Sequence, residues 1–282
     1  MIKVLKSGLF STIQDKGRFG YGEFGVPKSG AMDLFSFELA NTLLSNAVND
    51  AVLEITMIGP KLQFMIDTQI VISGANISPH LNDSLIHNNK VYNVKRNDIL
   101  SFKVLKSGLH AYVAVKDGFK SNVVLNSRSY FSPITSKAKI EDNDVLRIEQ
   151  SNLINKSPQT FSKLKPIDYS SNFLDVLKGP EFEKLSDKEK SVLLSSEFQV
   201  SNLYSRMAYQ LSPLFDNDLE SILTGPVLPG TVQLTPSGKL IVLMRDCQTT
   251  GGYPRVLQLT ESAINLLSQK KARDKIVFKL IE

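Results

Sequence analysis

Short apolar runs separated by turn residues constrain the fold of this chain more than any other feature. The runs alternate apolar with polar side chains or are continuously apolar, and they cover 69–73, 100–104, 110–115, 240–244 and 276–280. Glycine, asparagine and aspartate residues lie between them. Runs of this length bounded by turn residues are typical of β-strands. Many short strands in one chain predict a sandwich or a barrel.

Three segments carry helical signals instead, and they cover about 31–45, 187–195 and 261–269. Ser29 or Asp33 can cap the first helix, and Thr260 precedes the third. Ser186 and Glu189 fit a capping box at the start of the second. The helices do not alternate regularly with the strands, which argues against a doubly wound sheet. The predicted fold class is therefore mainly β, with β-barrel units and a few short helices.

The length of the chain indicates about two domains or one large β domain. It has 282 residues, 42% of them hydrophobic, which is enough to bury a large core. The polar stretch 151–165 is typical of a linker, and it divides the chain into an N-terminal domain 1–160 and a C-terminal domain 161–282. The spacing Leu-Glu-x4-Gly-Pro occurs at 53–60 and again at 219–226. This weak echo indicates either a duplicated barrel or a coincidence.

Composition and charge argue against several function classes. One cysteine and three histidines argue against a disulfide framework and a metal centre, so we expect no metal. The net charge of +5 is spread along the chain, whereas nucleic-acid binders usually concentrate it. The first residues lack the apolar core of a signal peptide, and no apolar run has the ~18 residues of a membrane helix. We therefore expect a cytoplasmic protein that binds neither nucleic acid nor membranes.

The familiar catalytic motifs are not found. The segment 225–231 has the glycine spacing of a phosphate loop, but it lacks the lysine and contains two prolines, which donate no amide hydrogen. No nucleophile elbow, zinc-protease helix or dinucleotide-binding motif occurs. Cys247 has no histidine near it in the sequence, and a lone cysteine beside an apolar strand is typical of core packing.

The segment 12–33 differs from ordinary core because it combines repeated glycine with fixed charges. Glycine lets the backbone turn tightly and approach a ligand closely. Asp15, Arg18 and Asp33 supply charges on that frame. Two interpretations remain: a ligand-binding loop, or a glycine-rich loop in which Asp15 and Arg18 pair structurally.

The segment 246–255 follows the apolar run 240–244, where loops commonly present functional groups. Its Gly251-Gly252 pair can aim backbone amides at an anion, and Thr249 and Thr250 add hydroxyl donors. Arg255 can bind a carboxylate through two hydrogen bonds, and Asp246 can accept a proton when it is desolvated. These residues predict a site for a small anionic ligand. The alternative is a hairpin with a Gly-Gly turn.

Motifs along the whole chain, taken in order, resemble those of one family. They run from 14–18 (QDKGR) and 25–33 (GVPKSGAMD) through 53–60 (LEITMIGP) and 126–129 (NSRS) to 205–207 (SRM), 229–233 (PGTVQ) and 248–254 (QTTGGYP). The ordered set resembles the biotin-dependent carboxyltransferase family, also called the allophanate hydrolase subunit 2 or KipA-like family. Its bacterial members include the C subunit of ATP-dependent 5-oxoprolinase.

The resemblance implies a fold built from two cyclophilin-like β-barrel units. It also implies a KipI-like partner, which is allophanate hydrolase subunit 1 or the B subunit of 5-oxoprolinase, and a LamB/YcsF-like A subunit. In 5-oxoprolinase this complex opens 5-oxo-L-proline to L-glutamate with ATP. ATP is thus implied for the complex, although this chain has no phosphate loop. Biotin is not expected on this chain, because it has no biotinyl-lysine motif.

For such an enzyme we predict catalytic roles for Asp15, Asp246 and Thr250. Either carboxylate would act as the base or orient an arginine, and Thr250 would bind an oxyanion or a phosphate with the Gly251-Gly252 amides. The arginines would hold the substrate carboxylate. The predicted substrate-binding residues are Arg18, Ser29, Asp33, Arg128, Arg206, Gln233, Gln248, Thr249, Gly251, Gly252 and Tyr253.

Two alternatives to the 5-oxoprolinase function stay open. One is a carboxyltransferase subunit of a urea carboxylase or allophanate-type system, which would need a separate biotin carboxylase and carrier. The other is a non-catalytic subunit that antagonises a KipI-type regulator. The family usually has glycine where this chain has Asp117 and Ala208, so the identity of the substrate is less secure than the fold.

Overall fold

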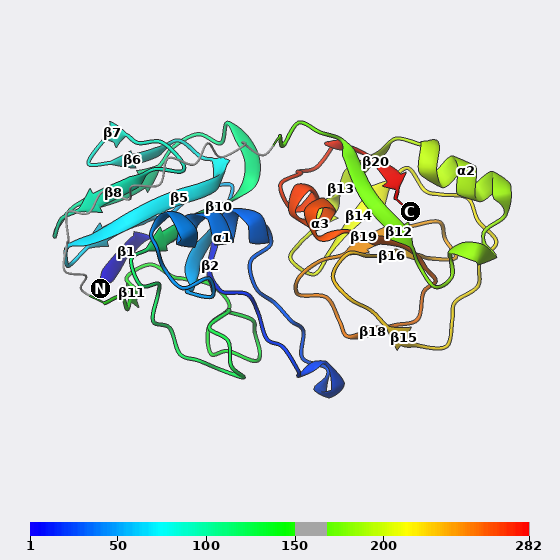
Figure 1. Ribbon diagram of the computed structural model, residues 1–282, viewed down its shortest axis with the longest axis horizontal. Coiled ribbons are helices and arrows are strands. Elements are labelled where there is room, and N and C mark those ends of the chain that lie inside the picture. The colour runs from blue at the N-terminus through cyan, green and yellow to red at the C-terminus, as the bar shows by residue number, and fades with distance from the viewer. Residues whose placement is uncertain (150–167, 282) are drawn as a thin grey trace. The chain divides into compact units, whose positions relative to one another are not determined.

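The computed structural model describes residues 1–149 and 168–281, and it divides into two compact units (Figure 1). The first unit comprises Met1–Gly17 and Asp33–Tyr169, and the second comprises Arg18–Met32 and Ser170–Glu282. The segment 18–32 therefore belongs to the second unit. The predicted domains 1–160 and 161–282 are contiguous in sequence and place this segment in the first. The expected linker 151–165, and with it the predicted boundary, lies outside the described residues.

Two antiparallel sheets form the first unit. One sheet has the order β11 (Val145–Leu146), β1 (Ile2–Lys6), β4 (Lys61–Phe64), β9 (Ile99–Phe102), β6 (Pro79–Leu81) and β7 (Ser84–Leu85). The other has the order β2 (Phe10–Gln14), β3 (Val52–Thr56), β10 (Ser107–Val115), β5 (Thr68–Asn76) and β8 (Val91–Val94). Both sheets bury apolar side chains in one core, among them Ile2, Phe64, Leu53, Ile72 and Val113. The unit is therefore a sandwich.

Helix α1 (Leu34–Leu43) covers the outer face of the five-stranded sheet and packs on β5 and β10. Across that interface Ser73 Oγ donates a hydrogen bond to the carbonyl oxygen of Ser36 at 2.6 Å. Asp33 is the N-cap, and its carboxylate accepts from the Ser36 amide at 3.1 Å. Of the two caps expected from the sequence, Asp33 is therefore the one that the helix uses.

A closed barrel forms the second unit. Its strands follow the order β12 (Phe173–Lys178), β19 (Arg255–Leu259), β16 (Thr231–Leu234), β17 (Leu240–Leu243), β14 (Ala208–Ser212), β13 (Phe198–Tyr204) and β20 (Lys275–Leu280). The pairing of β12 with β20 is parallel, and the other neighbours are antiparallel. Closure leaves the barrel without an unpaired edge. A separate short ladder joins β15 (Gly225–Pro226) to β18 (Thr250–Gly251).

Two α-helices flank this barrel (Figure 1). Helix α2 (Asp187–Ser195) packs against β20, and α3 (Glu261–Ser268) packs against β12. Ser186 and Glu189 form the predicted capping box at the start of α2, and Thr260 caps α3. Two 3₁₀ helices complete the described elements, η1 (Gly22–Phe24) and η2 (Phe182–Lys184).

The predicted fold class is confirmed, because the structure is mainly β with a closed barrel and few helices. Within the described residues the closed barrel belongs to the second unit, whereas the first unit is a sandwich. The repeated Leu-Glu spacing does not mark equivalent elements: 53–56 lies in β3, but 219–223 lies outside any strand. Among the described helices, none is long and apolar enough to cross a membrane.

Gly179 gives a test of the barrel packing. A Cβ at this position would lie 2.1 Å from the carbonyl oxygen of Arg255, and this backbone belongs to β19, which pairs with β12. We expect Gly179→Ala to lower the free energy of unfolding by about 2 kcal/mol, because the two backbones must separate. Urea unfolding measures this change.

Gly22→Ala is the matched control, because nothing lies within 4 Å of the added Cβ there. It should unfold at the urea concentration of the wild type. Equal midpoints for both variants would contradict the close approach of β12 and β19.

Candidate functional site

A cavity of about 510 Å³ opens on the barrel of the second unit. Its walls come from β13, β14, β16 and β17, from the turn after β13, and from the segments after β17 and β18. The lining residues are Asn202, Leu203, Tyr204, Ser205, Met207, Ala208, Gln210, Gln233, Ile241, Leu243, Gln248 and Tyr253. Three of the predicted site residues, Gln233, Gln248 and Tyr253, therefore lie around one cavity. A volume of this size accommodates a small molecule.

Two side-chain amides of this cavity carry buried polar atoms that lack a hydrogen-bond partner among the described residues. They are Nε2 of Gln233, a donor, and Oε1 of Gln248, an acceptor. Gln233 is only 2% exposed. Leaving such an atom unpaired costs about 1–3 kcal/mol, so nearly all buried polar groups are paired. The residues around the cavity therefore include one buried donor and one buried acceptor without a partner among the described residues.

Gly251 makes room for the Gln233 amide. A Cβ at position 251 would lie 2.4 Å from Gln233 Nε2. At Gly252 the nearest atom to an added Cβ is the Ile222 carbonyl oxygen, at 3.5 Å. The two glycines of the motif thus differ: the first is required by the packing of an amide, and the second has space around it.

The rest of the 248–254 motif is partly strand. Thr250 and Gly251 form β18, and the Thr249 carbonyl oxygen accepts from the Val227 amide at 3.0 Å. Neither Gly251 nor Gly252 has a positive φ, whereas an anion nest alternates right- and left-handed residues. The geometry therefore gives no such nest here. The roles of Thr249, Thr250 and Gly252 toward an anion stay predictions.

Arg206 and Asp246 form a nearly buried ion pair, and both are close in sequence to residues that line the cavity. Asp246 accepts from Arg206 Nε at 2.7 Å and from Arg206 Nη2 at 3.1 Å, which makes the pair bidentate. Both side chains are nearly buried. Of the two roles predicted for Asp246, this geometry supports the one in which it orients an arginine.

The same arginine holds the segment 18–32 within the second unit. Arg206 Nη2 donates to the carbonyl oxygen of Gly30 at 2.7 Å. The Ser29 amide donates to the carbonyl oxygen of Arg245 at 2.9 Å, and the Arg18 amide donates to that of Lys28 at 2.6 Å. The Ser29 hydroxyl is buried and has no hydrogen-bond partner among the described residues. The structure therefore brings Ser29, Arg206 and Asp246 together, and their predicted roles toward a substrate stay predictions.

Asp15, Asp33 and Arg128 lie in the first unit. Asp15 Oδ1 accepts from the Gly17 amide at 2.8 Å and from the Ser127 and Ser129 hydroxyls at 2.7 Å each, and its Oδ2 accepts from the Arg128 amide at 2.6 Å. The carboxylate thus fastens the loop 127–129 to the end of β2. The Arg128 guanidinium donates to the carbonyl oxygen of Ser121, and Asp33 caps α1. The predicted catalytic or binding roles of these residues stay untested.

Sequence reasoning missed Arg245, which is 1% exposed at the end of β17. It contacts Glu261 of α3, its Nε donates to the Met32 carbonyl oxygen at 3.4 Å, and its own carbonyl binds Ser29. A charged residue directly after an apolar strand is the signal that could have marked it. The residues Asn202 and Tyr204 of the cavity wall carry no such signal.

Two residues of the second unit, Cys247 and Arg255, make contacts that stabilise the fold. Burial in a small apolar cluster with Val227 and Leu243 raises the pKa of Cys247 to about 12, so the thiol stays protonated and unreactive at neutral pH. Arg255 binds the protein's own Glu181 through two hydrogen bonds of 2.9 and 2.8 Å, which lower the pKa of that carboxyl. The described residues contain no cluster of metal-ligating side chains.

Arg206→Gln tests the anchoring of the segment 18–32. We expect the free energy of unfolding to fall by about 3 kcal/mol, because the nearly buried carboxylate of Asp246 loses its partner. Hydrogen exchange at the Ser29 amide should accelerate more than exchange in the barrel strands, because Gly30 also loses its donor. Arg255→Gln breaks a second, largely buried ion pair of this unit, with Glu181, and serves as the control. Equal acceleration at Ser29 in both variants would contradict a specific anchor.

Comparison with known proteins assigns the chain to a group of relatives. The C subunit of 5-oxoprolinase from Escherichia coli is 30% identical over 275 residues, which are 95% of this chain and 87% of that protein. Urea amidolyase of Lachancea kluyveri is 41% identical over 131 residues, which are 46% of this chain and 7% of that enzyme.

Solved structures show the same fold. The urea carboxylase of Kluyveromyces lactis matches with a TM-score of 0.88 at 26% identity, covering 100% of this chain and 27% of that one. The crystal structure of TTHA0988 also matches with a TM-score of 0.88, covering 99% of this chain and 56% of that one. This chain thus spans about half the length of these structures or less. The model of the carboxyltransferase domain, subdomain A and B, matches residues 24–280, and the chain therefore belongs to this family.

Proposed function

We propose that this chain is a subunit of an ATP-dependent 5-oxoprolinase complex that opens 5-oxo-L-proline to L-glutamate. The observation that carries the proposal is the 30% identity to a 5-oxoprolinase C subunit over nearly the full length of both proteins. The partners would be a KipI-like B subunit and a LamB/YcsF-like A subunit, and the chain would be active only with them. Because the proposed reaction consumes ATP, we propose that the complex is located in the cytoplasm.

The cavity of the second unit suits a lactam. A lactam ring holds its N–H and C=O on the same side, so one edge presents a donor and an acceptor together. The ring carbonyl would accept from Gln233 Nε2, and the ring N–H would donate to Gln248 Oε1, which would satisfy both buried atoms. In this proposal the amides bind the substrate, and the bond that breaks is the ring C–N bond, with water adding to the carbonyl carbon.

ATP enters as a co-substrate of the complex. The segment 225–231 does not form a phosphate cradle, because its first residues pair in β15 and the Pro226 carbonyl oxygen accepts from Arg255 Nη1 at 2.9 Å. The neighbouring cation, Arg255, already binds Glu181. We therefore propose that the partner subunits supply the main nucleotide contacts.

Glutamate release from 5-oxo-L-proline and ATP tests the proposal directly. The chain would be combined with its KipI-like and LamB/YcsF-like partners, and each of the three proteins would be omitted in turn. We expect glutamate only in the complete mixture with ATP. Glutamate at an undiminished rate without this chain would overturn the proposal. A stable complex that forms no glutamate would favour the regulatory alternative.

A carboxyltransferase function is the second candidate, favoured by the 41% identity to the Lachancea kluyveri urea amidolyase over 131 residues. It predicts transfer of a carboxyl group from carboxylated biotin to urea by this chain. Radiolabelled bicarbonate, supplied with a separate biotin carboxylase and carrier, would reveal this transfer. The 5-oxoprolinase proposal expects none.

Gly251→Ala tests the amide that would bind the lactam. The added Cβ must displace the Gln233 amide, and the end of a flexible side chain moves easily, so the protein should still fold. We expect the KM for 5-oxo-L-proline to rise about tenfold in the complex, because one hydrogen bond to the substrate is lost. Gly22→Ala is the control, because nothing lies within 4 Å of an added Cβ there and Gly22 is not a predicted site residue, and it should keep the wild-type KM. Equal KM values for both variants would contradict the role of Gln233.

A further inference from the structure

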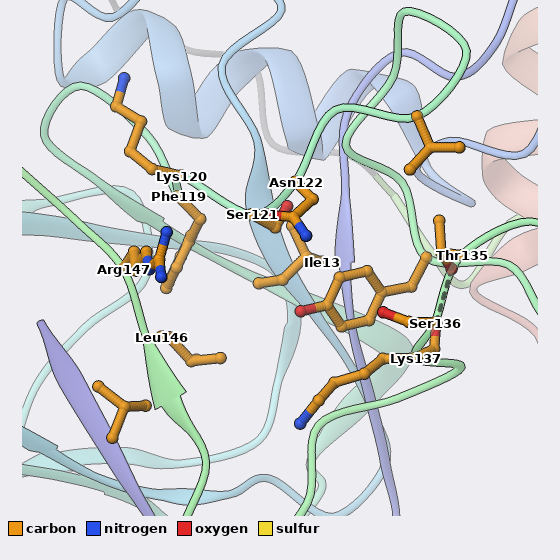
Figure 2. A pocket seen from close by; sticks show the side chains of 13 residues that line it. Ile13, Phe119, Lys120, Ser121, Asn122, Thr135, Ser136, Lys137, Leu146 and Arg147 are labelled. Atoms are coloured by element: carbon orange, nitrogen blue, oxygen red, sulfur yellow. Dashed lines mark hydrogen bonds between the residues drawn. The ribbon is translucent and has the colours of Figure 1, made fainter.

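We propose that the first unit holds a separate site for a small organic carboxylate, beyond the function proposed above. The site is a cavity of about 480 Å³ whose wall includes Ile13, Phe119, Asn122, Tyr130, Lys137 and Arg147 (Figure 2). None of the residues predicted for substrate binding or catalysis lines it. All of its lining residues belong to the first unit.

The topology explains why a cavity lies here. Strand β2 lies at one edge of the five-stranded sheet, and β11 lies at one edge of the six-stranded sheet. Irregular chain between 119 and 144 covers these edges: the Tyr130 amide donates to the Ile13 carbonyl oxygen at 2.9 Å, and the Lys120 amide donates to that of Arg147 at 2.8 Å. A loop that covers two sheet edges does not fill the space between them as a regular strand would.

One wall of the cavity is the apolar core of the sandwich. Ile13, Phe119 and Leu146 are buried and belong to the core cluster. In Figure 2 these side chains lie between Arg147 on one side and Lys137 on the other. Because they are packed on both sheets, these side chains form a rigid base, and the more accessible lining residues Val124, Tyr130 and Val145 offer apolar contact to a ligand.

The charges of the cavity leave one cation uncompensated. Lys137 pairs with Asp144, and Lys120 Nζ lies 3.6 Å from Glu149. Figure 2 shows the Lys120 amino group directed away from the other labelled side chains. Arg147, in contrast, has no ion pair with any residue in the described part of the chain. Its planar guanidinium suits a carboxylate, which it can bind with two parallel hydrogen bonds.

Neutral donors accompany Arg147. Asn122, Ser136 and Tyr130 line the cavity. Burial, with a smaller contribution from Asp144, raises the pKa of Tyr130, so its phenol stays protonated and can donate. An inorganic anion would gain nothing from the apolar wall. A carboxylate attached to a small hydrocarbon body uses both the cation and the wall, which makes it the ligand class that fits.

Titration of the full chain with benzoate tests the proposal. We expect saturable binding by isothermal titration calorimetry, about tenfold weaker in Arg147→Gln because the charge-assisted hydrogen bonds are lost. Benzamide, which has the same ring without the charge, and inorganic phosphate should both bind at least tenfold more weakly than benzoate. Arg96→Gln is the matched control, since Arg96 is exposed in the same unit and does not line the cavity.

A second variant blocks the cavity itself. Ser136 is exposed at its wall, so Ser136→Trp should leave the fold intact and abolish benzoate binding. No saturable binding, equal affinity in wild type and Arg147→Gln, or tighter binding of phosphate than of benzoate would each overturn the proposal. The titration uses neither ATP nor partner proteins, so its outcome is independent of the 5-oxoprolinase assay.

Discussion

The bidentate ion pair between Arg206 and Asp246 is the interaction on which the candidate site of the second unit depends. It fixes the loop after β17, and this loop carries Gln248. The same guanidinium binds the carbonyl oxygen of Gly30 and so fastens a segment that is remote in sequence. A nearly buried pair with further hydrogen bonds costs desolvation but specifies geometry, and here it aligns two parts of one site.

Strands of the closed barrel form most of the cavity wall, so the cavity is preformed. Gln233 lies on β16, which is paired on both sides, so its backbone has little freedom to relax. Its amide nitrogen has no partner among the described residues, and only a glycine at 251 leaves it room. Native structures tolerate such an unpaired group where a ligand supplies the missing partner. The barrel therefore fixes an unpaired amide beside the cavity, and the proposed contact with the lactam requires this kind of preorganisation.

Much of the fold could be predicted from the sequence, because local signals decide local structure. The capping box of Ser186 and Glu189 marked the start of α2, and the apolar runs fell on strands. The grouping of 18–32 with the second unit could not be predicted, since it rests on long-range hydrogen bonds to Arg206 and Arg245. The motifs identified Gln233 and Gln248 as candidates, but only the structure shows that both lie around one cavity and lack partners among the described residues. The carboxylate cavity of the first unit carries no motif at all.

The proposed function rests on the binding of the substrate lactam by the amides of Gln233 and Gln248. A crystal structure of the assembled complex with 5-oxo-L-proline tests it most directly. We expect the lactam carbonyl oxygen within hydrogen-bond distance of Gln233 Nε2 and the ring nitrogen within that distance of Gln248 Oε1. A lactam bound elsewhere in the complex, with both amide atoms still buried and unpaired, would contradict this role.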